Sequence, residues 1–98
     1  MNLQKLLKQA QQMQEKMQRE IAVLEVEASA GGGMVTARMN GQKQLLAVAI
    51  EPEVLVGGDA QMLGDLVVAA VNEAGRKIDE AVQSKLGGLA GGLPPGLP

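Results

Sequence analysis

Residues 34–51, MVTARMNGQKQLLAVAIE, decide the fold class of this 98-residue chain, because they predict two strands joined by a hairpin turn. Asn40-Gly41 is a strong hairpin signal, since both residue types tolerate positive φ. The second of these strands, 44–51, is apolar on both faces, one made of Leu45, Ala47 and Ala49 and the other of Leu46, Val48 and Ile50. A half-solvated strand would alternate, so we expect this one to be covered on both sides.

The flanking segments complete a three-stranded antiparallel meander between two helices. VLEVEAS (23–29) alternates as a strand and AGGG (30–33) follows it as a turn. After Pro52, residues 53–59 are expected to form a loop, with Asp59 as the N-cap of a helix over 60–86. Gly87-Gly88 is expected to end that helix. The Gly, Pro and Leu content of 89–98 predicts a mobile tail, which leaves residues 1–88 as the single folded domain.

The N-terminal segment predicts a helix from about Asn2, its N-cap, to Val23. Its apolar residues are spaced close to a heptad seam, at Leu3, Leu6, Ala10, Met13, Met17, Ile21 and Leu24. A narrow seam suits packing against one other helix better than covering a broad core. The helix is about 33 Å long, so we expect part of it to project from so small a domain.

A second face of this helix is basic. At about 100° per residue, its cations fall within an arc of roughly 80°, opposite the seam. These cations are Lys5, Lys8, Lys16 and Arg19, with Gln12 in the centre of the arc. Lys and Arg neutralise phosphates, and Gln can bond to phosphates or base edges. We take these five residues as the candidate DNA-binding site, although the same pattern is also typical of an ordinary solvated helix face.

Composition excludes several function classes. The chain has no Cys and no His, which removes thiol nucleophiles, imidazole bases and the usual zinc ligands, so no metal or other cofactor is expected. It has no aromatic residue, which disfavours base stacking and hence single-stranded nucleic acid. The N-terminus does not resemble a signal peptide and no stretch is long and apolar enough to span a bilayer, so we expect a cytoplasmic protein without a membrane partner.

Net charge is −2, yet the cations are unevenly distributed, with four cations against one anion in residues 1–19. Local field matters more than the total, so an acidic chain can still present a basic surface. The other candidates for chemistry are weak. Gly31–Gly33 is followed by a strand rather than the helix that a phosphate loop requires. The carboxylate pairs Glu25/Glu27 and Asp79/Glu80 are at expected exposed positions, so we do not expect an enzyme.

The apolar seam of the N-terminal helix and the doubly apolar strand 44–51 both expose more apolar surface than one protomer can bury. A homodimer would supply it most simply. We therefore predict an α+β fold, with an α-β-β-β-α protomer in which two long helices flank a three-stranded antiparallel sheet.

The chain also resembles the YbaB/EbfC family of bacterial nucleoid-associated proteins along nearly its whole length. The similarity is carried, in order, by LLKQAQQMQEKMQRE (6–20), EVEASAGGGMVTARMNG (25–41), DAQMLGDLVVAAVNEAGRKIDEA (59–81) and LGGLAGGLPPG (86–96). It implies a tweezer-like homodimer with projecting helices, located at the nucleoid. It also implies duplex DNA binding with low sequence specificity, attributed to the helix that here spans 2–23, and an effect on DNA conformation and gene expression.

Two functions remain open on the sequence. In the first, the basic face binds duplex DNA. In the second, the seam and an exposed strand edge dock another protein, such as a replication, repair or translation factor, and the cations only add solubility. Salt distinguishes the two, because apolar docking survives salt that removes DNA.

Overall fold

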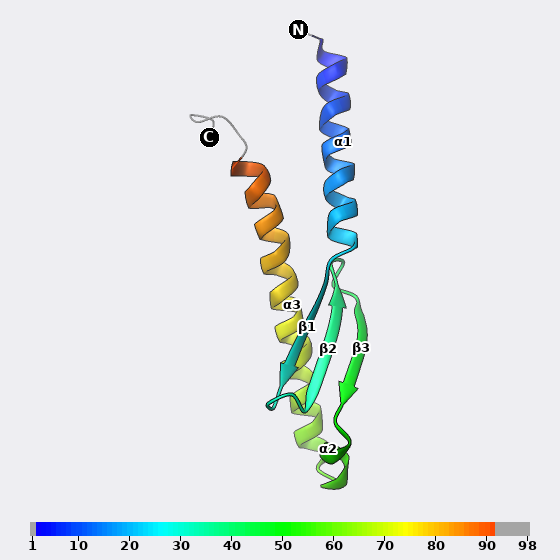
Figure 1. Ribbon diagram of the computed structural model, residues 1–98, viewed down its shortest axis with the longest axis vertical. Coiled ribbons are helices and arrows are strands. Elements are labelled where there is room, and N and C mark those ends of the chain that lie inside the picture. The colour runs from blue at the N-terminus through cyan, green and yellow to red at the C-terminus, as the bar shows by residue number, and fades with distance from the viewer. Residues whose placement is uncertain (1, 92–98) are drawn as a thin grey trace.

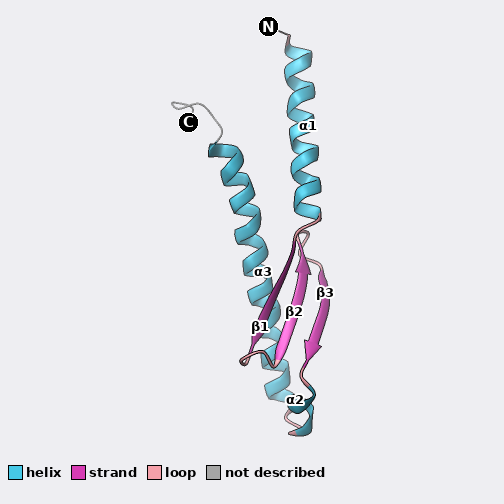
Figure 2. Ribbon diagram, in the orientation of Figure 1, coloured by secondary structure: helices cyan, strands magenta, loops and turns pink. Residues whose placement is uncertain are grey.

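The computed structural model describes residues 2–91 and has the predicted α-β-β-β-α order with one extra short helix (Figure 1). The elements are α1 (Leu3–Ala22), β1 (Glu25–Ala30), β2 (Val35–Asn40), β3 (Leu45–Ile50), α2 (Pro52–Val56) and α3 (Ala60–Gly91). Secondary structure is coloured separately in Figure 2, where the three strands form one layer and α3 a second layer behind it. The fold class and the element order predicted from the sequence are therefore confirmed.

The sheet is an antiparallel meander in the order β1-β2-β3. Glu25 pairs with Asn40 and Ala30 with Val35, so β1 and β2 are matched along their full length. The register between β2 and β3 shifts at Arg38/Met39. On the face away from α3, Ser29 and Thr36 share a hydrogen bond of 2.9 Å between their hydroxyls. Pairing therefore runs without a break between β1 and β2, and the irregularity of the sheet lies between β2 and β3.

The β2–β3 hairpin forms where predicted, but positive φ at Asn40 and Gly41 is not the reason. The only positive φ in this turn is that of Lys43, at 64°. The Asn40 side chain organises the turn instead, since its Oδ1 accepts from the backbone N–H groups of Gln42 and Gln44, each at 3.0 Å. The turn is therefore longer than the two-residue type that Asn-Gly favours, and it is built as an Asx turn.

The core lies between α3 and the first two strands. Its buried residues are Ala28, Val35, Ala37, Met39, Ala70, Ala74 and Ile78. Small side chains on both layers bring the α3 backbone close to the sheet, and Ile78 and Val35 are the largest side chains that are fully buried. The apolar face predicted for the second long helix thus packs on the sheet and forms one side of the core.

The expectation that β3 is covered on both sides is wrong for the single chain. α3 packs on β1 and β2 and makes no comparable contact with β3. A helix about 10 Å wide covers about two strands spaced 4.8 Å apart, so the third strand extends beyond it. Leu45 is 47% exposed and Leu46 42% exposed. β3 is consequently an edge strand with apolar side chains in contact with solvent.

Two predicted boundaries are also wrong. Residues 53–59 are not all loop, because α2 begins at Pro52, whose fixed φ suits the first position of a helix. The element has only five residues, too few for any periodicity to reveal it. Gly87-Gly88 does not end α3, which continues to Gly91. Glycine lowers helix propensity but does not forbid a helix. The predicted tail at 89–98 therefore begins inside α3, and residues 92–98 lie outside the described residues.

α1 projects from the sheet, in the same direction as the C-terminal half of α3 (Figure 1). The projection makes the molecule 69 Å long but only 24 Å by 15 Å across. The base of α1 is fixed to the hairpin, where the Gly41 N–H donates to the Leu24 carbonyl at 2.9 Å. A Cβ on Gly41 would lie 1.8 Å from the Ile21 carbonyl oxygen. Gly41 is therefore required for close approach, and that approach sets where α1 leaves the sheet.

Candidate nucleic-acid interface

All five residues of the candidate site, Lys5, Lys8, Gln12, Lys16 and Arg19, lie on α1 and are exposed. The helix forms locally, since the Asn2 side chain accepts from the Lys5 N–H at 3.3 Å and caps the first turn as predicted. Arg19 lies in the last turn, where a cation interacts favourably with the helix dipole. No residue of α1 is buried. The helix is therefore a rod that presents most of its side chains to solvent or to a partner, and only Met17, Glu20 and Ile21 are half-buried.

The cations of the chain fall into two groups according to their contacts. Within residues 2–91, no carboxylate forms an ion pair with Lys5, Lys8, Lys16 or Arg19. Each cation outside α1 has an acceptor. These pairs are Arg38–Glu25, Lys43–Asp79, Arg76–Glu73, Arg76–Glu80, Lys85–Glu20 and Lys77 with the Glu27 carbonyl. The charge that is available to an anionic ligand is thus concentrated on α1.

These ion pairs also involve three of the carboxylates that the sequence offered for acid–base chemistry. Glu25, Asp79 and Glu80 each face a cation rather than another carboxylate. The hydrogen bond from Arg76 also lowers the pKa of Glu73. A general acid needs a raised pKa, and the contact with Arg76 shifts the pKa of Glu73 in the opposite direction. Among residues 2–91, no three side chains of Asp or Glu cluster in a way that could hold a metal ion.

A groove separates α1 from the C-terminal half of α3. It has a volume of about 280 Å³ and is lined by Met13, Lys16, Met17, Glu20 and Lys85. Lys85 reaches across it from α3, and its Nζ lies 3.9 Å from a carboxylate oxygen of Glu20. Sequence reasoning missed Lys85 because no local pattern joins it to α1. Only the antiparallel arrangement of the two helices brings it near Lys16.

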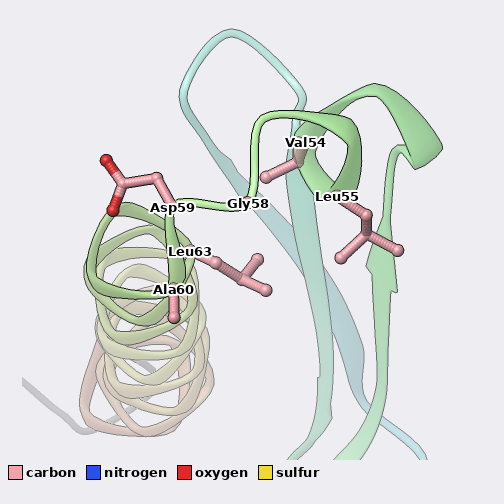
Figure 3. A pocket seen from close by; sticks show the side chains of 6 residues that line it. All are labelled: Val54, Leu55, Gly58, Asp59, Ala60 and Leu63. Carbon is pink, nitrogen blue, oxygen red and sulfur yellow. The ribbon is translucent and has the colours of Figure 1, made fainter.

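A second hollow lies at the opposite end of the molecule, between α2 and the start of α3 (Figure 3). It has a volume of about 180 Å³ and is lined by Val54, Leu55, Gly58, Asp59, Ala60 and Leu63. The Asp59 carboxylate points away from Leu55 and Leu63 in Figure 3. Its Oδ1 accepts from the Met62 N–H at 2.9 Å, so it caps α3 as predicted. The one ionisable side chain that lines this hollow is therefore used as a helix cap.

None of the helices within residues 2–91 combines the length and the apolar composition that crossing a membrane requires.

Comparisons with known proteins agree with the fold and identify the family. The model of the YbaB/EbfC DNA-binding family matches residues 1–93. A nucleoid-associated protein of Koribacter versatilis is 53% identical over 97 residues, which cover 99% of this chain and 94% of the relative. A nucleoid-associated protein of Acidobacterium capsulatum is 48% identical, with 97% and 94% covered.

Among solved structures, an uncharacterized protein from Helicobacter pylori superposes with a TM-score of 0.76. The superposition covers 92% of this chain and 98% of that one, at 18% sequence identity, so it supports the fold alone. The family model spans both the exposed basic helix and the sheet–helix core. This chain therefore belongs to the YbaB/EbfC DNA-binding family.

Proposed function

We propose that this protein binds duplex DNA with low sequence specificity through the basic face of α1, defined as Lys5, Lys8, Gln12, Lys16 and Arg19. The observation that carries the proposal is the division of the cations. Those of α1 have no carboxylate partner within residues 2–91, whereas those elsewhere are paired. A paired cation must give up its partner to bind a phosphate, and an unpaired one gives up only water and counterions.

Low specificity follows from the kinds of side chain on this face. Lys and Arg contacts to phosphates position a protein on DNA without reading its sequence. Gln12 is the one residue of the face with an amide suited to base edges. The face spans about 21 Å from Lys5 to Arg19, which is long enough to follow several successive phosphates of one strand.

We further propose that the protein acts as a homodimer in which a second copy covers β3. This strand has one unpaired backbone edge, and its apolar Leu45 and Leu46 are exposed. Exposed apolar edge strands are templates for pairing with another chain. A dimer would carry two basic faces, and the second face would raise the affinity of an otherwise modest cluster of cations.

Light scattering at micromolar concentration tests the dimer, and we expect twice the mass of the chain. Leu46→Lys should shift the species toward the monomer and weaken DNA binding in parallel. A wild-type mass equal to that of one chain would remove the dimer from the proposal and leave the α1 face to be tested on the monomer.

The DNA proposal is tested by titrating salt against binding to random-sequence duplex DNA, measured by fluorescence anisotropy. If about half of the cations of two α1 helices contact phosphates, log K should fall with log salt with a slope of about −3 to −4. Replacing Lys5, Lys8, Lys16 and Arg19 by Gln should flatten that slope and leave the dimer intact.

The chain offers a matched control for that variant. Replacing Arg38, Lys43, Arg76 and Lys77 by Gln removes the same charge from paired positions. We expect this control, once circular dichroism shows it folded, to keep most of the wild-type slope. Equal losses in both variants would mean that net charge rather than the α1 face governs binding.

The family resemblance extends the proposal to the cell. We propose that the protein is located at the nucleoid and that its binding alters DNA conformation and gene expression. Single-molecule tethering of DNA should show a change in extension with the wild-type protein and none with the α1 variant at the same salt.

A second function is favoured by a different observation, the exposed apolar seam of α1. Leu3 is 68% exposed, Leu6 45% and Met13 52%. In this alternative the seam docks another protein, and the basic face only keeps the helix soluble. Capture of a protein partner that persists at salt concentrations that abolish DNA binding would support it.

A further inference from the structure

A lysine outside α1 lies against the basic face. Lys85 belongs to the C-terminal half of α3, and its side chain reaches across the groove to Glu20 of α1. Among residues 2–91 this is the one ion pair that joins α1 to another element. Lys16, a member of the basic face, lines the same groove. Two cations from different helices therefore share this groove with a single carboxylate.

Helical geometry places Glu20 at the edge of the basic face. At about 100° per residue, Glu20 lies about 40° around α1 from Lys16, on the side toward the α3 groove. The order around this part of the surface is therefore the basic face, then Glu20, then Lys85. Because Lys16 and Lys85 line the same groove, a phosphate bound at Lys16 would lie on the same side of α1 as Lys85.

The contact between Lys85 and Glu20 is of a kind that a phosphate can replace. Its separation of 3.9 Å is longer than the 3.3 Å between Lys43 and Asp79. The side chains of Lys85 and Glu20 are 32% and 43% exposed. Partly exposed lysine–carboxylate pairs contribute little net free energy, and a phosphate oxygen is an equally good acceptor for an ammonium group. Exchange of Glu20 for phosphate therefore faces only a small penalty.

We propose that Lys85 is an additional phosphate-binding residue, held by Glu20 in the free protein and transferred to the DNA backbone on binding. This inference rests on the proposed binding of duplex DNA through α1. It extends the DNA-binding surface from one helix to two. Glu20 then weakens DNA binding, because its carboxylate pairs with Lys85 in the free protein and repels phosphates beside Lys16.

The test is a set of salt titrations on random-sequence duplex DNA with the full chain. The variants are Lys85→Gln, Glu20→Gln, the double variant, and Lys85→Arg as the conservative replacement. Lys43→Gln is the matched control, since it removes one lysine from another exposed ion pair that does not line the groove. Light scattering on each variant checks that its assembly state is that of the wild-type protein.

We expect Lys85→Gln to flatten the salt slope by about 0.9 for each Lys85 engaged, Lys85→Arg to retain it, and Lys43→Gln to match the wild type. Glu20→Gln should tighten binding by about two- to fivefold at low salt, the size expected for release from an exposed ion pair. That gain should shrink when Lys85 is already Gln, because no lysine is then left to be released.

Two results would overturn the inference while the proposed function stands. One is a wild-type slope for Lys85→Gln in an experiment in which the variant lacking the four α1 cations loses its slope. The other is an equal gain from Glu20→Gln with and without Lys85, which would mean that Glu20 acts by repulsion alone. Absence of salt-dependent binding by the wild-type protein would instead overturn both proposals together.

Discussion

The two long helices of this protein have opposite roles although both are amphipathic. α1 buries none of its residues, whereas α3 buries Ala70, Ala74 and Ile78 against the sheet. The apolar positions of α1 form a narrow seam between Lys and Gln side chains, and those of α3 form a broad face rich in small residues. The difference separates two tasks along one chain, because α3 supplies the stability and α1 supplies the exposed charge.

The largest expected effect comes from shortening one apolar side chain in each long helix, which tests whether α3 alone supplies the stability. Ile78 is 1% exposed, so Ile78→Ala should lower the free energy of unfolding by about 2–5 kcal/mol. Leu6 is 45% exposed, so Leu6→Ala should lower it by less than about 1 kcal/mol. Urea denaturation followed by circular dichroism measures both. Similar losses would show that the seam of α1 is buried in the assembled protein and that both long helices contribute to stability.

A smaller effect is expected where the end of α1 meets the β2–β3 hairpin. Gly41→Ala places a Cβ against the Ile21 carbonyl and forces α1 or the hairpin to move. We expect a loss of about 1–3 kcal/mol, as for other substitutions that overfill a packed site. Gly57→Ala is the control, because φ there is −74° and no atom lies within 4 Å of the added Cβ. If thermal unfolding shows equal effects at the two glycines, the close approach at Gly41 does not hold α1 in place.

The smallest effect is expected at the far end of α1. Asn2→Ala removes the side chain that caps the first turn, at a cost of about 1 kcal/mol. Because α1 packs broadly on no other element, we expect this loss to appear as local fraying of α1 with an unchanged global transition. Hydrogen exchange should show faster exchange in the first turns of α1 and no change in β2. A shift of the global transition would mean that α1 and the core unfold as one unit.

Much of the fold was predictable because its signals are local. Asn2 and Asp59 were identified as N-caps from residue type and position, and both side chains accept the expected backbone N–H. The first strand was predicted by its alternation, and the other two by the hairpin signal at Asn40-Gly41 and the apolar run that follows it. The turn at Gly31–Gly33 was predicted by composition, and these three glycines do adopt positive φ. The errors have local causes too. α2 is too short to show a period, and Gly87-Gly88 lowers helix propensity without being able to stop α3 alone.

The candidate DNA-binding site also has a part that is set by local sequence and a part that is set by tertiary packing. The sequence by itself determined the basic face of α1, since helical periodicity alone fixes which side chains share a face of a single helix. The tertiary structure decided which cations are paired, that β3 lies beyond the reach of α3, and that Lys85 faces Glu20 across 65 positions of sequence. Those facts depend on how separate elements pack, and packing is set by shape and burial over the whole chain rather than by any local pattern.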